Sequence, residues 1–118
     1  MPGLTRTFAD CELAYISEDL GVARMFRYVW DGMIQDNMAD KEKRIHPTQK
    51  PIALYRFILQ NYAKPGYKIL DTHVGSASSL IACEEMGLSY LGFEVDPEYY
   101  EMAKDRLDTF NRQVRFDI

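Results

Sequence analysis

The chain has 118 residues, 47% of them hydrophobic, and a formal net charge of −4. This length corresponds to about one ordinary domain with a buried core, and no apolar run is long enough to cross a membrane. The negative charge argues against a domain whose binding depends mainly on phosphate contacts. The N-terminus lacks a signal-peptide pattern, so Cys11 and Cys83 are predicted to be free thiols in a cytoplasmic protein.

The N-terminal part is predicted to form two strands and a loop. Aromatic and other β-favouring residues dominate Phe8 to Ser17 and Ala23 to Trp30, and a turn fits between them. The polar stretch from Gly32 to Lys43 is typical of a loop. We therefore divide the single domain, residues 1–118, into an N-terminal part (1–43) and a larger second part (44–118).

The second part begins with a predicted helix and a short strand. Apolar residues recur at helical spacing from Pro51 to Tyr62, and proline suits the first position of a helix. Pro65-Gly66 interrupts this pattern. The apolar stretch from Tyr67 to Leu70 predicts a strand that ends at Asp71.

A helix, a strand and a second helix follow. The first helix is predicted over Ser78 to Met86 and is stopped by Gly87, and the strand over Leu88 to Phe93. Asp96 is placed to cap the last helix, before Pro97 and Glu98. The apolar stripe of this helix contains Tyr99, Ala103 and Phe110.

This order of elements is typical of the first half of a nucleotide-binding unit with parallel strands. The small residues Gly75 to Ser78 let a ligand approach the backbone at a helix N-terminus. Glu94 follows Asp71 by 23 positions (94 − 71), at the end of the second strand, where a carboxylate can accept hydrogen bonds from a ribose. No GxGxxG motif is present. The sequence thus favours a cofactor that contains adenosine.

Basic residues and histidines add two weaker signals. His46 and His73 lack the spacing of metal ligands, so no metal site is predicted. The basic residues fit either solvated surface charge or a patch that touches nucleic acid. They form two groups: Lys41, Lys43, Arg44 and Lys50, then Arg106, Arg112 and Arg115.

Three segments carry a resemblance to a known family. HPTQKP (46–51), KPGYKILDTHVGSASS (64–79) and YLGFEVDPEYYEMAKDRL (90–107) together resemble the C-terminal half of beta-type DNA amino-methyltransferases. These bacterial and phage enzymes methylate adenine N6 or cytosine N4 with S-adenosylmethionine. The stretch CELAYIS…FRYVWDGM is similar to the region that precedes HPTQKP in phage-type members. The resemblance implies a partial Rossmann-like class I methyltransferase fold, with a parallel βαβα unit, N-terminal strands and three αβα layers.

The resemblance also implies roles for the residues around the two strand ends. Asp71 meets the methionine end of the cofactor, Glu94 binds the ribose, and Val95 packs near the adenine. Thr48 and Lys50 reach the methionine carboxylate. The backbone and side chains of the loop approach the methionine and adenosine parts through Thr72, His73, Gly75 and Ser76.

The cofactor loop departs from the family pattern DPFxGSGTT, and three of the departures bear on the site. Thr72 replaces the proline, and His73 replaces the phenylalanine, either as a functional group or as the occupant of the aromatic slot. Ala77 stands where glycine is usual. If this position requires a positive φ, alanine strains the loop and weakens cofactor binding.

The family's catalytic motif, D/N/S-P-P-Y/F/W, does not occur in this sequence. Its first side chain and a proline carbonyl orient the amine of the flipped target base. No Pro-Pro pair is present, and Asp96-Pro97-Glu98-Tyr99 is interpreted as a helix N-cap. The prediction therefore contains no catalytic residue, and the chain alone is expected not to methylate DNA.

Several readings of the chain stay open. It is a truncated remnant, a fragment, or one part of a split methyltransferase; alternatively it is a non-catalytic module for cofactor binding or interaction. DNA is the partner that the family implies, with weak binding by this chain alone. The family's sheet has more strands than this chain predicts, which leaves an open edge at Tyr67 to Leu70. We therefore expect a homo-oligomer or association with a complementing catalytic half.

Overall fold

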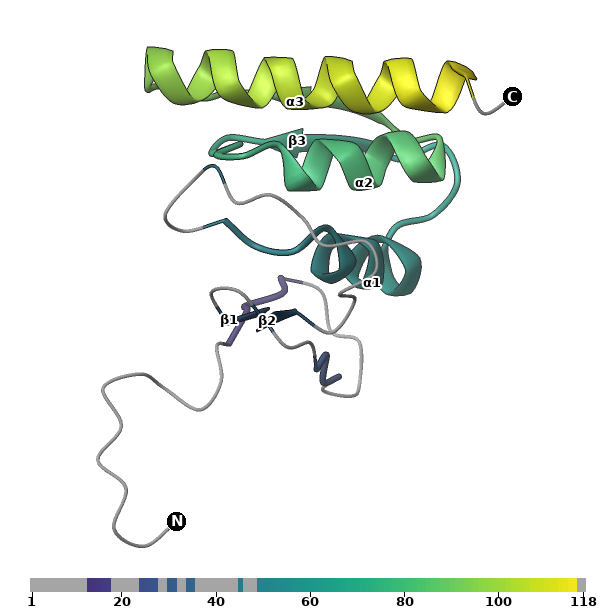
Figure 1. Cartoon of the computed structure of the whole chain (residues 1–118). Coiled ribbons are helices and arrows are strands. Elements are labelled where there is room, and N and C mark those ends of the chain that lie inside the picture. Colours follow the sequence, from purple (N-terminus) through teal and green to yellow (C-terminus); the bar gives the residue numbers. More distant parts are fainter. Residues whose placement is uncertain are drawn as a thin grey trace, which may run out of the picture.

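The computed structural model describes residues 13–17, 24–27, 30–31, 34–35, 45 and 49–116. The described elements are arranged as Figure 1 shows, with α3, α2 and α1 one above another. In chain order they are β1 (Trp30–Asp31), β2 (Ile34–Gln35), α1 (Ile52–Tyr62), β3 (Lys68–Asp71), α2 (Ser78–Met86), β4 (Ser89–Gly92) and α3 (Pro97–Phe116). None of the helices in this described part is both long and apolar enough to cross a membrane.

The N-terminal strand predictions are wrong over most of the residues that test them. Residues 13–17 and 24–27 contain no strand, and Trp30 is the one described residue of the two predicted ranges that lies in a strand. The other residues of both ranges lie outside the described residues. The strands found instead are the two-residue β1 and β2, which pair antiparallel; β2 falls within the predicted loop. Leu13 and Tyr15 are 95% and 91% exposed, so their side chains pack against little of the described structure. The β-propensity of a residue such as tyrosine depends on packing of this kind.

The predicted parallel βαβ unit is confirmed. β3 and β4 are parallel neighbours, with Ile69 opposite Tyr90 and Leu70 opposite Leu91, and α2 forms the crossover between them. The predicted strand boundaries differ from the observed ones by one residue. The fold is a partial Rossmann-like α/β fold, and this parallel pair is its centre.

Three local signals fix the helix ends, two of them as the sequence indicated. Pro51 was predicted as the first residue of a helix, but it is the extended N-cap, with φ −67° and ψ 146°, and α1 begins one residue later. α2 ends at Gly87, whose φ of 69° is the left-handed conformation expected of a glycine C-cap. The Asp96 carboxylate accepts the N–H groups of Glu98 and Tyr99 at 2.9 and 3.1 Å. Asp96 is therefore the N-cap of α3, as predicted.

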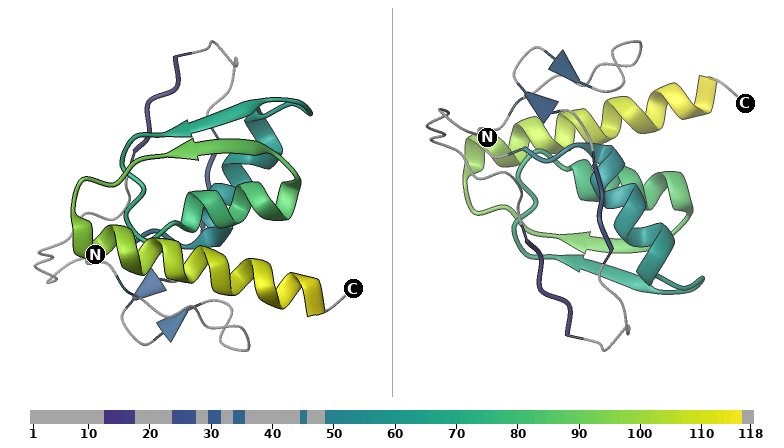
Figure 2. Two further views of the ribbon diagram at one scale, coloured as in Figure 1. Left: turned by 90° about the horizontal axis from the view of Figure 1, so that it is seen from above. Right: turned by 90° about the horizontal axis from the view of Figure 1, so that it is seen from below.

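The helices cover one face of the strand pair. Ile69 and Tyr90 pack into a core with Leu59 of α1 and with Ala82 and Cys83 of α2. A second cluster joins α2 to α3, and it contains Ala77, Leu80, Ala103, Val74, Tyr90 and Leu107. Figure 2 shows α2 and α3 on the same side of the strands. Cys83 is a buried free thiol, whereas Cys11 lies outside the described residues.

The other face of the strand pair is open in the described part of the chain. Leu70, Leu91 and Phe93 are 62%, 59% and 55% exposed. Of the three layers expected, the described residues therefore supply two, the sheet and one layer of helices. β3 pairs with β4 alone among these residues, so its other edge has no neighbouring strand.

Gly92 lets the helical layer approach β4 closely. A Cβ atom at this position would lie 2.5 Å from Val74 Cγ2 and 3.0 Å from Leu80 Cδ1. Gly92→Ala is therefore expected to destabilise the chain by about 1–3 kcal/mol, because an added methyl group in a packed core displaces its neighbours. The unfolding midpoint in urea would measure this loss.

Ser89→Ala is the matched control for this substitution. Ser89 is an exposed residue of the same strand, and changes at such positions usually alter stability by less than about 0.5 kcal/mol. Equal urea midpoints for Gly92→Ala and Ser89→Ala would contradict the close packing of Gly92 against Val74.

Candidate functional site

Two carboxylates meet at the carboxyl ends of the parallel strands. Asp71 is the last residue of β3 and lies opposite Gly92, the last residue of β4. The Phe93 N–H donates to the Asp71 carbonyl at 2.9 Å, which keeps the two chain segments together beyond the strands. Glu94 follows directly. The edge of the sheet where ligands bind in such folds therefore carries both acids proposed from the sequence.

Glu94 ties the small-residue loop to the end of β4. Its Oε1 accepts the Gly75 N–H at 2.8 Å, and its Oε2 accepts the Asp96 N–H at 3.0 Å. Each carboxylate oxygen has two lone pairs, so one acceptor position on each oxygen is left for a ligand. Glu94 thus has two tasks that the sequence did not separate: it holds the loop, and it can accept hydrogen bonds from a diol.

Asp71 is held by the loop and by α2. Its Oδ1 accepts the His73 N–H at 2.9 Å, and its Oδ2 accepts the Ser79 hydroxyl at 2.5 Å. A cleft of about 250 Å³ lies beside Asp71, between α1, α2 and β3. Its lining includes Asp71, Ser79, Tyr55 and Cys83. Burial raises the pKa of Tyr55, and the charge of Asp71 raises it further. The cleft therefore disfavours additional negative charge.

The loop between β3 and α2 requires a positive φ at Ala77, as anticipated. Ala77 has φ 71° and ψ 17° and is the N-cap of α2. It is the only residue other than glycine with a positive φ in the described part of the chain. The left-handed conformation costs an ordinary residue roughly 1–2 kcal/mol. Some other part of the structure must therefore offset this strain.

The remaining residues proposed from the sequence lie in different surroundings. Thr72 and His73 are exposed, and the Thr72 hydroxyl lies 2.8 Å from His73 Nδ1. Ser76 is buried, whereas Val95 is 95% exposed beside Glu94 and offers an apolar surface. Two polar residues of the HPTQKP segment were also proposed: Lys50 lies half-buried ahead of α1, and Thr48 lies outside the described residues.

One residue of the HPTQKP segment has a structural task that the sequence analysis did not assign. Gln49 is buried, and its Oε1 accepts the Ile45 N–H at 2.8 Å. This bond joins Ile45 to Gln49 immediately before α1. Buried polar groups in proteins usually have such a partner, so Gln49 helps to hold the chain just ahead of α1 in place.

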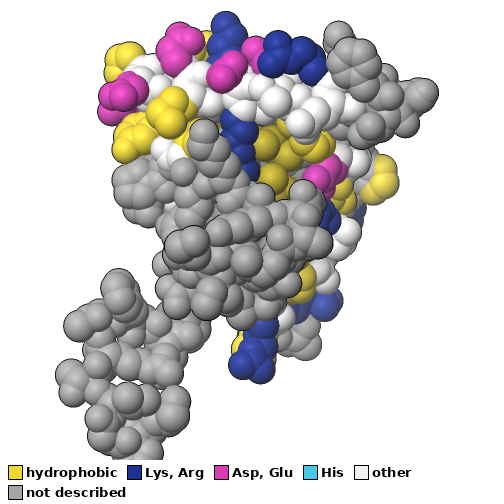
Figure 3. All heavy atoms as spheres, viewed as in Figure 1, with side chains coloured by type: hydrophobic (Ala, Val, Ile, Leu, Met, Phe, Trp, Pro, Cys, Tyr) yellow, Lys and Arg dark blue, Asp and Glu magenta, His cyan; other side chains and the backbone are white. Residues whose placement is uncertain are grey.

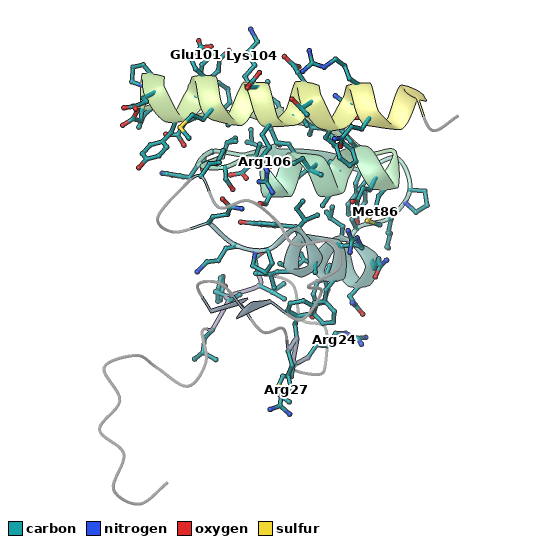
Figure 4. The ribbon with its side chains drawn as sticks, in the orientation of Figure 1. Arg24, Arg27, Met86, Glu101, Lys104 and Arg106 are labelled. Atoms are coloured by element: carbon teal, nitrogen blue, oxygen red, sulfur yellow. The ribbon has the colours of Figure 1, made fainter. Side chains whose placement is uncertain are left out.

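The sequence analysis also missed the role of Arg106, which it grouped with basic residues that fit surface charge or a nucleic-acid patch. Arg106 is half-buried and donates from Nη1 to the Ser76 carbonyl at 2.8 Å. In Figure 4 its side chain extends from α3 toward α2, whereas those of Glu101 and Lys104 extend away. The signal was available, because Arg106 lies between Ala103 and Phe110 on the inward stripe of α3. On the visible surface of α3, acidic and basic side chains lie among each other, which is typical of a face in contact with water (Figure 3).

Comparison with known proteins identifies similar sequences and a similar structure. The family model described as DNA methylase, N6_N4_Mtase, matches residues 20–105. Type II methyltransferase M.HpaI of Haemophilus parainfluenzae is 40% identical over 70 residues, which cover 59% of this chain and 22% of that protein. Type II methyltransferase M2.DpnII of Streptococcus pneumoniae is 30% identical over 96 residues, covering 81% of this chain and 35% of that protein.

One similar solved structure is the crystal structure of the M1.HpyAVI–SAM complex. It is 36% identical in sequence, has a TM-score of 0.52, and covers 54% of this chain and 32% of that chain. The chain thus spans between 22% and 35% of the length of these three relatives.

Proposed function

Because the chain belongs to the DNA methylase family, we propose that it supplies the S-adenosylmethionine-binding half of a DNA amino-methyltransferase. The whole enzyme of this kind transfers a methyl group to adenine N6 or cytosine N4 in DNA. Such a reaction takes place where DNA is, which agrees with the cytoplasmic location expected from the sequence. The observation that carries the proposal is the placement of Asp71 and Glu94 at the ends of adjacent parallel strands.

The chemistry of this site matches the chemical groups of the cofactor. S-adenosylmethionine contains an ammonium group, a carboxylate, a ribose diol and an adenine, and when bound it supplies an activated methyl group. The unused acceptor positions of Glu94 suit the diol, and the exposed Val95 suits one face of the adenine. Asp71 suits the ammonium, with Thr72, His73, Gly75 and Ser76 around it. Thr48 and Lys50 remain our candidates for the carboxylate.

Calorimetric titration with S-adenosylmethionine and with S-adenosylhomocysteine tests this proposal directly. We expect weak binding of both compounds, because Ala77 strains the loop and β3 pairs with β4 alone in the described part of the chain. Asp71→Asn removes the charge beside the cleft and should reduce affinity for both compounds. No measurable heat at millimolar ligand with the unaltered chain would contradict the proposal.

We expect no methyl transfer to DNA from this chain alone. The sequence contains no Pro-Pro pair. The segment Asp96-Pro97-Glu98-Tyr99 is similar to the catalytic motif in sequence. The Asp96 carboxylate, however, accepts two backbone N–H groups as the N-cap of α3. Among the residues that the structure describes, none is therefore assigned to orient the amine of a target base.

The measurement is incorporation of labelled methyl groups from S-adenosylmethionine into unmethylated DNA. A complete amino-methyltransferase serves as the positive control in the same buffer. Labelled N6-methyladenine or N4-methylcytosine produced by highly purified chain would contradict the expectation. Methylation that appears only after a second polypeptide with an Asp-Pro-Pro-Tyr motif is added would identify one part of a split enzyme.

The alternative function is a non-catalytic module that binds the cofactor or another protein chain. The open face with Leu70, Leu91 and Phe93 favours association with another protein chain, both for such a module and for half of a methyltransferase. We propose that the isolated chain forms a homo-oligomer through this face, and that a complementing catalytic half covers it in a split enzyme. DNA binding by the chain alone is proposed to be weak, since its net charge is −4.

A further inference from the structure

Arg106 donates hydrogen bonds to both residues that flank the strained Ala77. Its Nη1 lies 2.8 Å from the Ser76 carbonyl oxygen and 3.2 Å from the Ser76 hydroxyl. The same nitrogen lies 2.9 Å from the Ser78 hydroxyl. These bonds join α3 to a loop 28 to 30 positions earlier in the chain. Ser76 and Ser78 are buried, so Arg106 is a main source of hydrogen bonds for polar atoms that water does not reach.

Ala77 is constrained from both sides by its own backbone. Its N–H donates to the Val74 carbonyl at 3.1 Å, and its carbonyl accepts the Ile81 N–H at 3.0 Å, the first bond of α2. A return to an ordinary negative φ would break one of these bonds. The left-handed conformation nevertheless opposes folding by an amount equivalent to roughly a tenfold change in an equilibrium constant.

We propose that Arg106 is a positioning residue for the cofactor loop. By holding Ser76 and Ser78, it keeps Ala77 in its left-handed conformation and keeps the Gly75 N–H against Glu94. Hydrogen bonds from a charged donor to buried acceptors are strong enough to offset the strain of one residue. The inference rests on the proposed function, because the loop that Arg106 fixes is the one assigned to the cofactor. It also explains how alanine is accepted where the family usually has glycine.

A purely structural role for Arg106 makes a different prediction. If Arg106 only anchored α3 to α2, its removal would have the same effect whichever residue stands at position 77. If it offsets the strain of Ala77, its removal matters less once glycine stands there, since glycine adopts a positive φ without strain. A double-mutant cycle between the two positions therefore separates the roles.

The cycle uses Arg106→Met, Ala77→Gly and the double variant, with affinity for S-adenosylhomocysteine measured by calorimetry. Methionine retains an apolar stem but removes the guanidinium group. We expect Arg106→Met to lower affinity more than about tenfold beside Ala77, and about threefold or less beside glycine. Arg112→Met is the matched control, because Arg112 is exposed on the same helix and donates to Thr109. Equal losses in both backgrounds would overturn the inference.

Hydrogen exchange in the ligand-free chain tests the same coupling independently of the cofactor. The Gly75 and Ala77 amides donate to Glu94 and to the Val74 carbonyl, so both are protected only while the loop keeps its shape. Arg106→Met should speed their exchange roughly tenfold, and Ala77→Gly should reverse most of this change. The unaltered chain could fail to bind the cofactor although the exchange rates show this coupling. That result would reject the proposed function but would support the role of Arg106 in positioning the loop. Absence of the coupling would reject the role of Arg106.

Discussion

Glu94→Ala is expected to lower the affinity for S-adenosylhomocysteine by more than tenfold. The substitution removes acceptors for the proposed ribose diol, and loss of a charged hydrogen-bond partner costs roughly 1.5–3 kcal/mol. It also releases the Gly75 N–H, at 2.8 Å from Oε1, and the Asp96 N–H, at 3.0 Å from Oε2. Calorimetry measures the affinity. Glu101→Ala, which removes the same charge from the exposed outer side of α3 (Figure 4), should leave it unchanged.

The two tasks of Glu94 can be separated by changing the ligand. A 2′-deoxy analogue of S-adenosylhomocysteine lacks one of the hydroxyls that the carboxylate is proposed to hold. If Glu94 contacts the ribose, the unaltered chain should prefer the hydroxylated ligand, and Glu94→Ala should lose most of this preference. If Glu94 only holds Gly75 and Asp96 in place, the substitution will weaken both ligands equally. That outcome would contradict a role for Glu94 in binding the ribose.

The second part of the chain could be predicted from its sequence because its signals are local. Gly87 ends α2 in the left-handed conformation, and Asp96 caps α3, as their residue types indicated. The crossover rule then makes β3 and β4 parallel and brings Asp71 and Glu94 to the same edge. The family resemblance was confirmed by the match to the DNA methylase model over residues 20–105. The roles assigned to individual cofactor residues stay predictions.

The features that the sequence did not reveal depend on contacts between distant segments. Tyr15 and Ile16 have β-favouring side chains, but a strand also needs a neighbour with which to pair, and propensity alone does not supply one. Arg106 was interpreted as surface charge or part of a nucleic-acid patch because its partners, Ser76 and Ser78, are 28 to 30 positions away. A charged residue within an apolar helical stripe is the signal that should have prompted a search for buried acceptors.

The purified chain is expected to assemble through the open face of the β3–β4 pair. Leu70 and Leu91 lie opposite each other on this face and are 62% and 59% exposed, and Phe93 is 55% exposed beside them. Apolar side chains grouped in this way are stabilised when another surface covers them. The edge of β3 has no neighbouring strand in the described part of the chain, and such an edge readily pairs with another chain. Light scattering after size-exclusion chromatography should therefore give at least twice the 13.7 kDa mass of one chain.

The paired substitution Leu70→Lys with Leu91→Glu should reduce this assembly to a monomer. Both side chains already contact water, and opposite charges at facing positions of neighbouring strands attract, so the fold itself should lose little stability. Tyr100→Lys with Met102→Glu is the matched control, since both side chains are exposed on α3 and the net charge again stays constant. An unaltered chain that is monomeric at micromolar concentration would contradict the proposed oligomer. Assembly that survives the paired substitution would place the interface elsewhere on the chain.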